Sequence, residues 1–241
     1  LYSAGMGAPT SFHPHITPAA LRAGLRGAAA FVPGFVIFGA AIGALAAQQG
    51  LTAAQILAQS LLVYAGASQM VSLQMWQHPW TWGGVVAVVS VTAAVNARFV
   101  LMGASMRPDL GALPQGRVYG VLFFLTDASW AIGMRPAADG GRDFGALVAA
   151  SVSLYLLWAA TTGLGFFLGA LIVHPERYGL DLIMVFVFTT FLTPILRRSA
   201  RLWPYAAAGA AALAAHWLGA GHWTILIGAL AGAFAAAAGR P

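Results

Sequence analysis

Cysteine and lysine are absent from the 241-residue chain, and both absences exclude chemistry. Without cysteine there is no disulfide, thiol nucleophile, cysteine-ligated zinc site or iron–sulfur cluster. Without lysine there is no Walker A loop for ATP hydrolysis and no Schiff-base chemistry. All twelve basic side chains are therefore arginine. We expect neither a cofactor nor a bound metal.

Charged residues are scarce, at 7% of the chain, whereas 60% are hydrophobic and the mean hydropathy is +0.79. A soluble domain usually carries about 25% charged residues. The composition therefore predicts a multi-pass integral membrane protein, all-α because backbone in lipid must satisfy its own hydrogen bonds. The net charge of +6 comes from arginines scattered between apolar runs. That pattern is typical of cytoplasmic loops and does not indicate a nucleic-acid partner.

Residues 1–27 form a polar N-terminal segment, and we expect residues 28–241 to form one transmembrane domain. About eight apolar segments follow the N-terminal segment. They lie near residues 28–48, 53–76, 82–106, 117–134, 144–173, 181–197, 203–218 and 222–239. A helix of about 20 residues is long enough to cross the hydrocarbon layer.

The second segment contains the polar stretch Ala65-Gly66-Ala67-Ser68-Gln69 in the middle of an apolar run. Small residues of this kind permit close helix packing. They also permit an unwound turn that lines a cavity. The residues favour neither reading over the other.

A weak internal repeat favours the unwound turn. Gly39-x3-Gly43 precedes a predicted break at Tyr64 to Gln69, and Gly165-x3-Gly169 precedes a second predicted break at Thr193-Pro194. Pro33, Gly34 and Gly39 predict a further break in the first segment. The repeat halves would be residues 28–134 and 144–239. In secondary transporters such halves often form inverted repeats with broken or re-entrant helices.

The loop arginines slightly favour re-entrant second and sixth segments. That topology places nine of them inside and two outside, against eight and three if all eight segments span. We therefore expect the two segments to enter the membrane and return.

Three polar side chains lie deep in apolar segments: Asn96, Arg98 and Asp127. A charge within a spanning segment costs at least about 2.5 kcal/mol on insertion scales. An Arg98–Asp127 ion pair would satisfy both charges at once. Such a pair either holds two helices together or binds the charged groups of a substrate. Asp181, at the start of the sixth segment, is either a helix N-cap or part of that site.

Several short motifs follow one another along the chain. They are Pro33-Gly34-x3-Phe38-Gly39-x3-Gly43, Gly50-Leu51, Ser60, Ala65 to Gln69, Asn96-x-Arg98, Leu125-Thr126-Asp127 and Gly179-Leu180-Asp181. As an ordered set, over about residues 28–195, they make the chain resemble the AzlC family, the large subunit of branched-chain amino-acid exporters. Two positions depart from the family pattern: Phe99, where His is usual, and Ala128, where Glu is usual.

The resemblance implies export of valine, leucine or isoleucine, with methionine as a further candidate, across the bacterial cytoplasmic (inner) membrane. It also implies a small AzlD-type membrane subunit as partner. Buried carboxylates fit proton coupling better than ATP coupling. The sequence is compatible with a homo-oligomer as well.

The predicted site lies where the breaks meet at mid-membrane. The residues expected to bind the substrate carboxylate, through freed backbone N–H groups or side chains, are Gly66, Ser68, Gln69, Asn96 and Arg98. Asp127 or Asp181 would face the ammonium group and carry the proton, and the first and fifth segments would form an apolar wall.

Two alternatives come from other classes of function. An uncoupled channel would show a continuous polar stripe, whereas these polar residues cluster in depth. Ser68 and His216 suggest a rhomboid-like intramembrane protease dyad. Gln69 stands where that protease family has Gly, which argues against the dyad. We expect the chain not to be an enzyme.

Overall fold

The computed structural model describes residues 12–13, 16–76, 79–111, 113–135, 142–170, 189, 193, 196–197, 201–220 and 223–238. These residues are helical apart from short connections and one parallel pair of two-residue strands, β1 (Phe12–His13) and β2 (Arg142–Asp143). The predicted all-α class is therefore confirmed.

The expectation of about eight apolar segments is not confirmed. Within the described ranges, two helices are long and apolar enough to cross a membrane: α5 (Trp82–Leu110) and α8 (Phe144–Ala170). A third span is possible if α1 (Pro18–Ala29) and α2 (Val32–Gln48) together form one bent span. The other apolar segments are divided into shorter helices or fall outside the described residues.

The chain divides into two compact units. The first contains residues 1–66 and 97–170, and the second contains residues 67–96 and 171–241. These units do not coincide with the predicted repeat halves, so the repeat stays a prediction. Helix α1 begins within the polar N-terminal segment, at Pro18.

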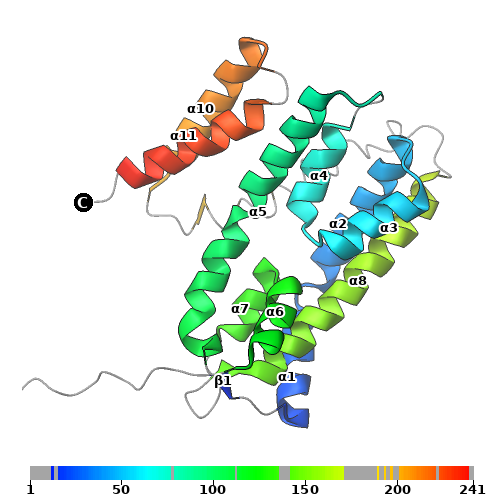
Figure 1. Cartoon of the computed structure of the whole chain (residues 1–241), viewed down its shortest axis with the longest axis vertical. Coiled ribbons are helices and arrows are strands. Elements are labelled where there is room, and N and C mark those ends of the chain that lie inside the picture. The colour runs from blue at the N-terminus through cyan, green and yellow to red at the C-terminus, as the bar shows by residue number, and fades with distance from the viewer. Residues whose placement is uncertain are drawn as a thin grey trace, which may run out of the picture. The chain divides into compact units, whose positions relative to one another are not determined.

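Helix α8 is the centre of the first unit, and α1, α2, α3 (Ala53–Leu62) and α7 (Asp127–Gly133) pack against it (Figure 1). Small residues make the α2–α8 contact close. A Cβ on Gly43 or Gly165 would overlap the backbone of the facing helix, at Thr162 and Ala40 respectively. The Gly-x3-Gly pairs of the sequence are thus helix-contact residues.

The chain bends by 60° between α1 and α2. Pro33 lies in the first turn of α2, where its missing N–H leaves no hydrogen bond unmade. Gly34 and Gly39 lie inside the continuous helix α2, so the break precedes them rather than falling at them. Gly39 instead packs against Thr161 of α8.

Two predicted segments are broken in the middle. The second divides into α3 and α4 (Gly66–Gln74), with a break at residues 63–65. The break comes at the beginning of the polar stretch, whose residues 66–69 form the first turn of α4, and Gly66 makes a close packing contact there. The fourth segment, expected as one helix over 117–134, divides into α6 (Gln115–Phe123) and α7, with a break at residues 124–126.

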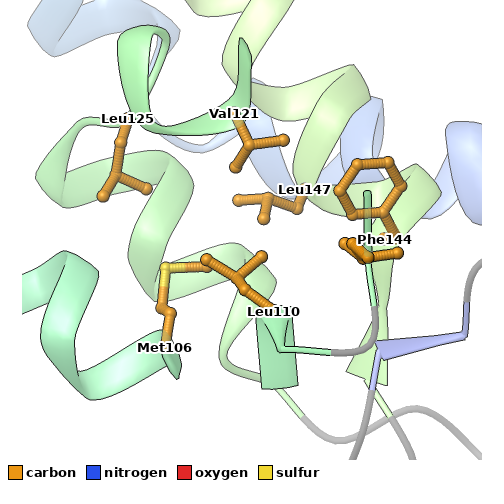
Figure 2. Close-up of a cluster of buried hydrophobic side chains, with 7 residues drawn as sticks. Met106, Leu110, Val121, Leu125, Phe144 and Leu147 are labelled. Carbon is orange, nitrogen blue, oxygen red and sulfur yellow. The ribbon is translucent and has the colours of Figure 1, made fainter. Parts of the chain in front are cut away.

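A cluster of buried apolar side chains packs around Leu125 of the second break. Figure 2 shows Leu125, from the break itself, beside side chains from the end of α5, from α6 and from the start of α8. The cluster comprises Met106, Leu110, Leu113, Val121, Leu125, Phe144 and Leu147. Its burial fixes the position at which the chain leaves α6 and enters α7.

The second unit contains most of α4, the first half of α5, and the helices α10 (Trp203–Trp217) and α11 (Thr224–Ala238). Helices α10 and α11 pack against each other through small residues, with Gly228 and Gly232 facing Ala212 and Ala208. Each has 15 residues, fewer than the roughly 20 that cross a bilayer.

Candidate functional site

The first break has a strained backbone. Tyr64 adopts a φ of +44°, a left-handed conformation that residues with a bulky side chain rarely adopt. Such outliers persist only where the surroundings enforce them, and they concentrate at functional sites. Here Tyr64 is 4% exposed, and its ring meets Tyr155 of α8 edge to face at 4.9 Å.

Gly66 is the first residue of α4 and lies directly against aromatic rings. A Cβ at this position would stand 2.7 Å from Cη2 of Trp158 and 2.9 Å from Cε1 of Phe38. The same two rings meet edge to face at 5.5 Å. Helix α4 can therefore begin here only because residue 66 has no side chain.

Ser68 and Gln69 follow in the first turn of α4, and both are almost completely buried. The residue before α4 is Ala65, which has no side-chain oxygen to cap the first N–H groups. Helix α4 thus starts inside the protein, and the side chain of the preceding residue cannot cap it.

The second break is capped. Thr126 and Ser129 form a reciprocal capping box: the Thr126 hydroxyl accepts from the Ser129 N–H at 3.2 Å, and the Ser129 hydroxyl accepts from the Thr126 N–H at 2.9 Å. Asp127 is the first residue of α7. A carboxylate is favourable there because the helix dipole places positive charge at the N-terminus.

The predicted ion pair is present. Nη2 of Arg98 lies 3.1 Å from Oδ2 of Asp127, with 40% and 53% of the two side chains exposed in the isolated chain. Arg98 is two residues from the middle of α5, which is about 3 Å along the helix axis. Its Nε atom is buried, with no hydrogen-bond partner among the described residues.

A second polar contact joins the same two helices. Nε1 of Trp130 in α7 donates to Oγ of Ser105 in α5, at 3.1 Å. Ser105 is seven residues after Arg98, and Trp130 is three after Asp127, so each pair lies on one helix face. One face of α5 therefore holds α7 through two polar contacts.

Asn96 does not share that face. Residues two apart on a helix point in nearly opposite directions, and α5 is regular from Trp82 to Leu110. Asn96 and Arg98, which were expected in one site, therefore cannot both face the same ligand. The Oδ1 atom of Asn96 is buried, with no hydrogen-bond partner in the part of the chain that the structure describes.

Tyr155 of α8 touches both breaks, and nothing in the sequence motifs indicated it. Its hydroxyl donates to the Leu61 carbonyl at 2.9 Å, and its ring meets Tyr64 and Phe124 edge to face at 4.9 and 4.8 Å. The Tyr64 hydroxyl in turn lies beside Thr126. The two breaks therefore lie against each other in the first unit.

The two departures from the family pattern have structural roles of their own. The guanidinium of Arg98 lies over the Phe99 ring, 5.1 Å from its centroid, which is a cation–π distance. Ala128 is buried in an apolar cluster with Ile132 of the same helix and Leu154 of α8. A Glu at position 128 would place a charge in that cluster.

The remaining predicted residues are less informative. Asp181 and Pro194 lie outside the described residues. Thr193 is helical, and its hydroxyl donates to the Thr189 carbonyl at 2.6 Å. His216 is exposed near the end of α10, whereas Ser68 is 1% exposed, which does not favour a protease dyad. No cluster of three or more His, Cys, Asp or Glu suited to a metal occurs within the described ranges.

Long apolar helices, two broken helices and a charged pair at one of the breaks are features of a membrane transporter. Residues 30–172 match the model of a family described as AzlC protein. The chain belongs to the AzlC family, a family of membrane transporters. The resemblance read from the motifs is thereby confirmed. No curated protein and no solved structure matches the chain.

Proposed function

We propose that the chain is the large subunit of a proton-coupled secondary transporter that exports valine, leucine and isoleucine, with methionine as a further substrate. The membrane is the bacterial cytoplasmic (inner) membrane, and the partner is a small AzlD-type subunit. The observation that carries the proposal is the half-exposed Arg98–Asp127 pair at a helix break.

An amino acid is a zwitterion, and this pair presents one charge for each of its ends. The substrate carboxylate would bind the guanidinium of Arg98, and the ammonium group would bind the carboxylate of Asp127. Insertion of the substrate exchanges one protein ion pair for two protein–substrate pairs. No unpaired charge is then left in the membrane, where an unpaired charge has a high free-energy cost.

An aromatic cluster supports the choice of an apolar amino acid. Phe35 and Phe38 of α2 and Trp158 of α8 form a contiguous aromatic cluster, with ring centroids 5.5 to 5.6 Å apart. Phe38 and Trp158 lie against Gly66 at the start of α4, and the cluster fits the expected apolar wall. Ser68 and Gln69 stay predicted substrate contacts on the strength of the sequence.

Asp127 is also the proposed proton carrier. Protonation of its carboxyl would release the ammonium group and weaken the contact to Arg98. Asp181 stays a predicted second carrier.

The test is efflux of leucine and valine from preloaded cells that express the chain, with and without its small partner. We expect an imposed proton gradient to drive efflux and Asp127→Asn to reduce it to about a thirtieth, since one lost charge-assisted contact of about 2 kcal/mol corresponds to that factor. Asp143→Asn is the matched control. Asp143 caps α8 by accepting from the N–H groups of Gly145 and Ala146, and Asn can make the same contacts.

Wild-type efflux in a folded Asp127→Asn variant would contradict the role of Asp127. Efflux that never exceeds passive equilibration would indicate an uncoupled channel instead. Absence of efflux for every branched-chain amino acid, with the protein inserted and its partner present, would overturn the proposed substrates.

A further inference from the structure

The two breaks share one neighbour on α8, Tyr155, and this residue belongs to none of the motifs described above. Three elements meet at its side chain: the end of α3, the first break and the second break. Its contacts fall into two kinds, one made by the hydroxyl and the others by the ring.

The hydroxyl satisfies a backbone group that the first break leaves free. In a continuous helix the carbonyl of Leu61 would accept from the N–H four residues later, but α3 ends at Leu62. The hydroxyl of Tyr155 donates to that carbonyl instead, at 2.9 Å. Within a membrane an unpaired carbonyl is expensive, so this contact holds the end of α3 in place.

The ring serves both breaks at once. It meets Tyr64 at 4.9 Å with an interplanar angle of 81°, and Phe124 at 4.8 Å with an angle of 87°. Both are edge-to-face contacts, a geometry that contributes beyond simple burial of area. Phe124 is the C-cap of α6, three residues before Asp127. The ring therefore lies between the strained Tyr64 and the segment that carries the ion-paired carboxylate.

The geometry points to Tyr155 as a positioning residue that couples the two helix breaks: its hydroxyl holds the first break, and its ring holds both. A movement of either break must displace the ring and thereby reach the other. The consequence for transport rests on the proposed function, because the second break positions Asp127. The coupling itself is a property of the fold and can be tested without substrate.

The absence of cysteine allows a direct test. Single reporters at Ala65→Cys and Leu125→Cys replace side chains that are 3% and 4% exposed, one in each break. A third reporter, Ala46→Cys near the end of α2, lies in a fully buried position, and its neighbour Ala44 packs against Gly169, fourteen residues along α8 from Tyr155. The rate of modification by a small maleimide, in purified full-length protein without substrate, measures how often each site opens.

Tyr155→Phe removes only the hydroxyl. We expect it to speed labelling at position 65 about fivefold, the factor that corresponds to one ordinary hydrogen bond, and to speed labelling at position 125 by a smaller factor, because the remaining ring transmits the opening of the first break. Tyr155→Leu removes the ring and should speed labelling at both positions. Position 46 should keep its rate in both variants. Tyr119→Phe, on the exposed surface of α6, is the matched control and should change no rate.

Unchanged rates at positions 65 and 125 in both Tyr155 variants would overturn the proposal, and so would equal acceleration at all three positions, which indicates general loosening. The outcome is separable from the transport assay. The labelling rates could shift as expected in a chain that transports no amino acid. That result would support the coupling and contradict the proposed function. In a chain that does export leucine, we further expect Tyr155→Phe to raise the half-saturating concentration more than it lowers the maximal rate.

Discussion

The two breaks in the first unit achieve the same interruption by opposite means. At the second break the chain caps itself: Thr126 and Ser129 satisfy each other's backbone N–H groups, and Asp127 places a negative charge at the helix start. At the first break a strained Tyr64 and an alanine precede α4, whose first residue is a glycine pressed against aromatic rings. The first break depends on its surroundings, whereas the second adds a cap of its own to the packing around it.

This difference predicts how each break responds to change. A self-capped helix start stays formed when its neighbours move, so the second break suits a rigid support for the ion-paired carboxylate. A break that depends on packing moves when its neighbours move, because closely packed side chains must rearrange together. The first break is therefore the better candidate for the moving part.

The largest effect is expected at Gly66. Gly66→Ala would force the Trp158 or Phe38 ring to move, because the new Cβ would lie within 3 Å of both. We expect the free energy of unfolding to fall by about 1–3 kcal/mol, as overpacking does elsewhere. Chemical denaturation in detergent micelles measures it.

Gly34→Ala is the control for that change. A Cβ at Gly34 meets nothing within 4 Å, so only the gain in helix propensity remains, at most about 1 kcal/mol. Equal destabilisation of both variants would show that the aromatic contact at Gly66 is not what the first break depends on.

A smaller effect is expected at the cap of the second break. Thr126→Ala removes one half of the capping box and should cost about 1 kcal/mol. Thr126→Ser keeps the oxygen and should restore most of that loss. Thermal unfolding of the purified protein, read by circular dichroism, separates the two. A loss in Thr126→Ser as large as in Thr126→Ala would mean that the methyl group, and not the cap, stabilises α7.

The smallest effect should come from placing a side-chain oxygen directly before α4. Ala65→Ser adds an oxygen before α4, and we expect a gain of no more than about 0.5 kcal/mol, since burial of the hydroxyl offsets part of the cap. The same denaturation experiment measures it. A gain of about 1 kcal/mol or more would show that the first N–H groups of α4 are unsatisfied in the resting protein. A clear loss would show that those groups already have better partners.

Local residue chemistry predicted the first break but not the second. Gly66 and Ser68 in an apolar run indicated an interruption, because glycine and serine are poor residues for a spanning helix interior. Phe124 and Leu125 carry no such signal. The Thr126-x-x-Ser129 spacing was the available sign, but serine at the third position is a weaker capping partner than the usual Glu or Gln.

The site was predicted in part for the same reason. Two opposite charges in apolar segments lower their cost of insertion by pairing, so the Arg98–Asp127 contact could be predicted from that cost alone. Asn96 was grouped with Arg98 because the two are close in sequence, although a regular helix separates their directions. Tyr155 could not be found at all, since an aromatic residue in an apolar helix is ordinary.

The sequence by itself determined the class of protein, its helical character, its family and the charged pair, because the membrane penalises each unpaired polar group wherever it stands in the chain. Only the tertiary structure decided where the helices break, which face of α5 carries the site and which residue of α8 joins the two breaks. Those features depend on contacts between residues 60 to 95 positions apart, such as Leu61 with Tyr155 and Tyr64 with Thr126. No local pattern encodes contacts of that range.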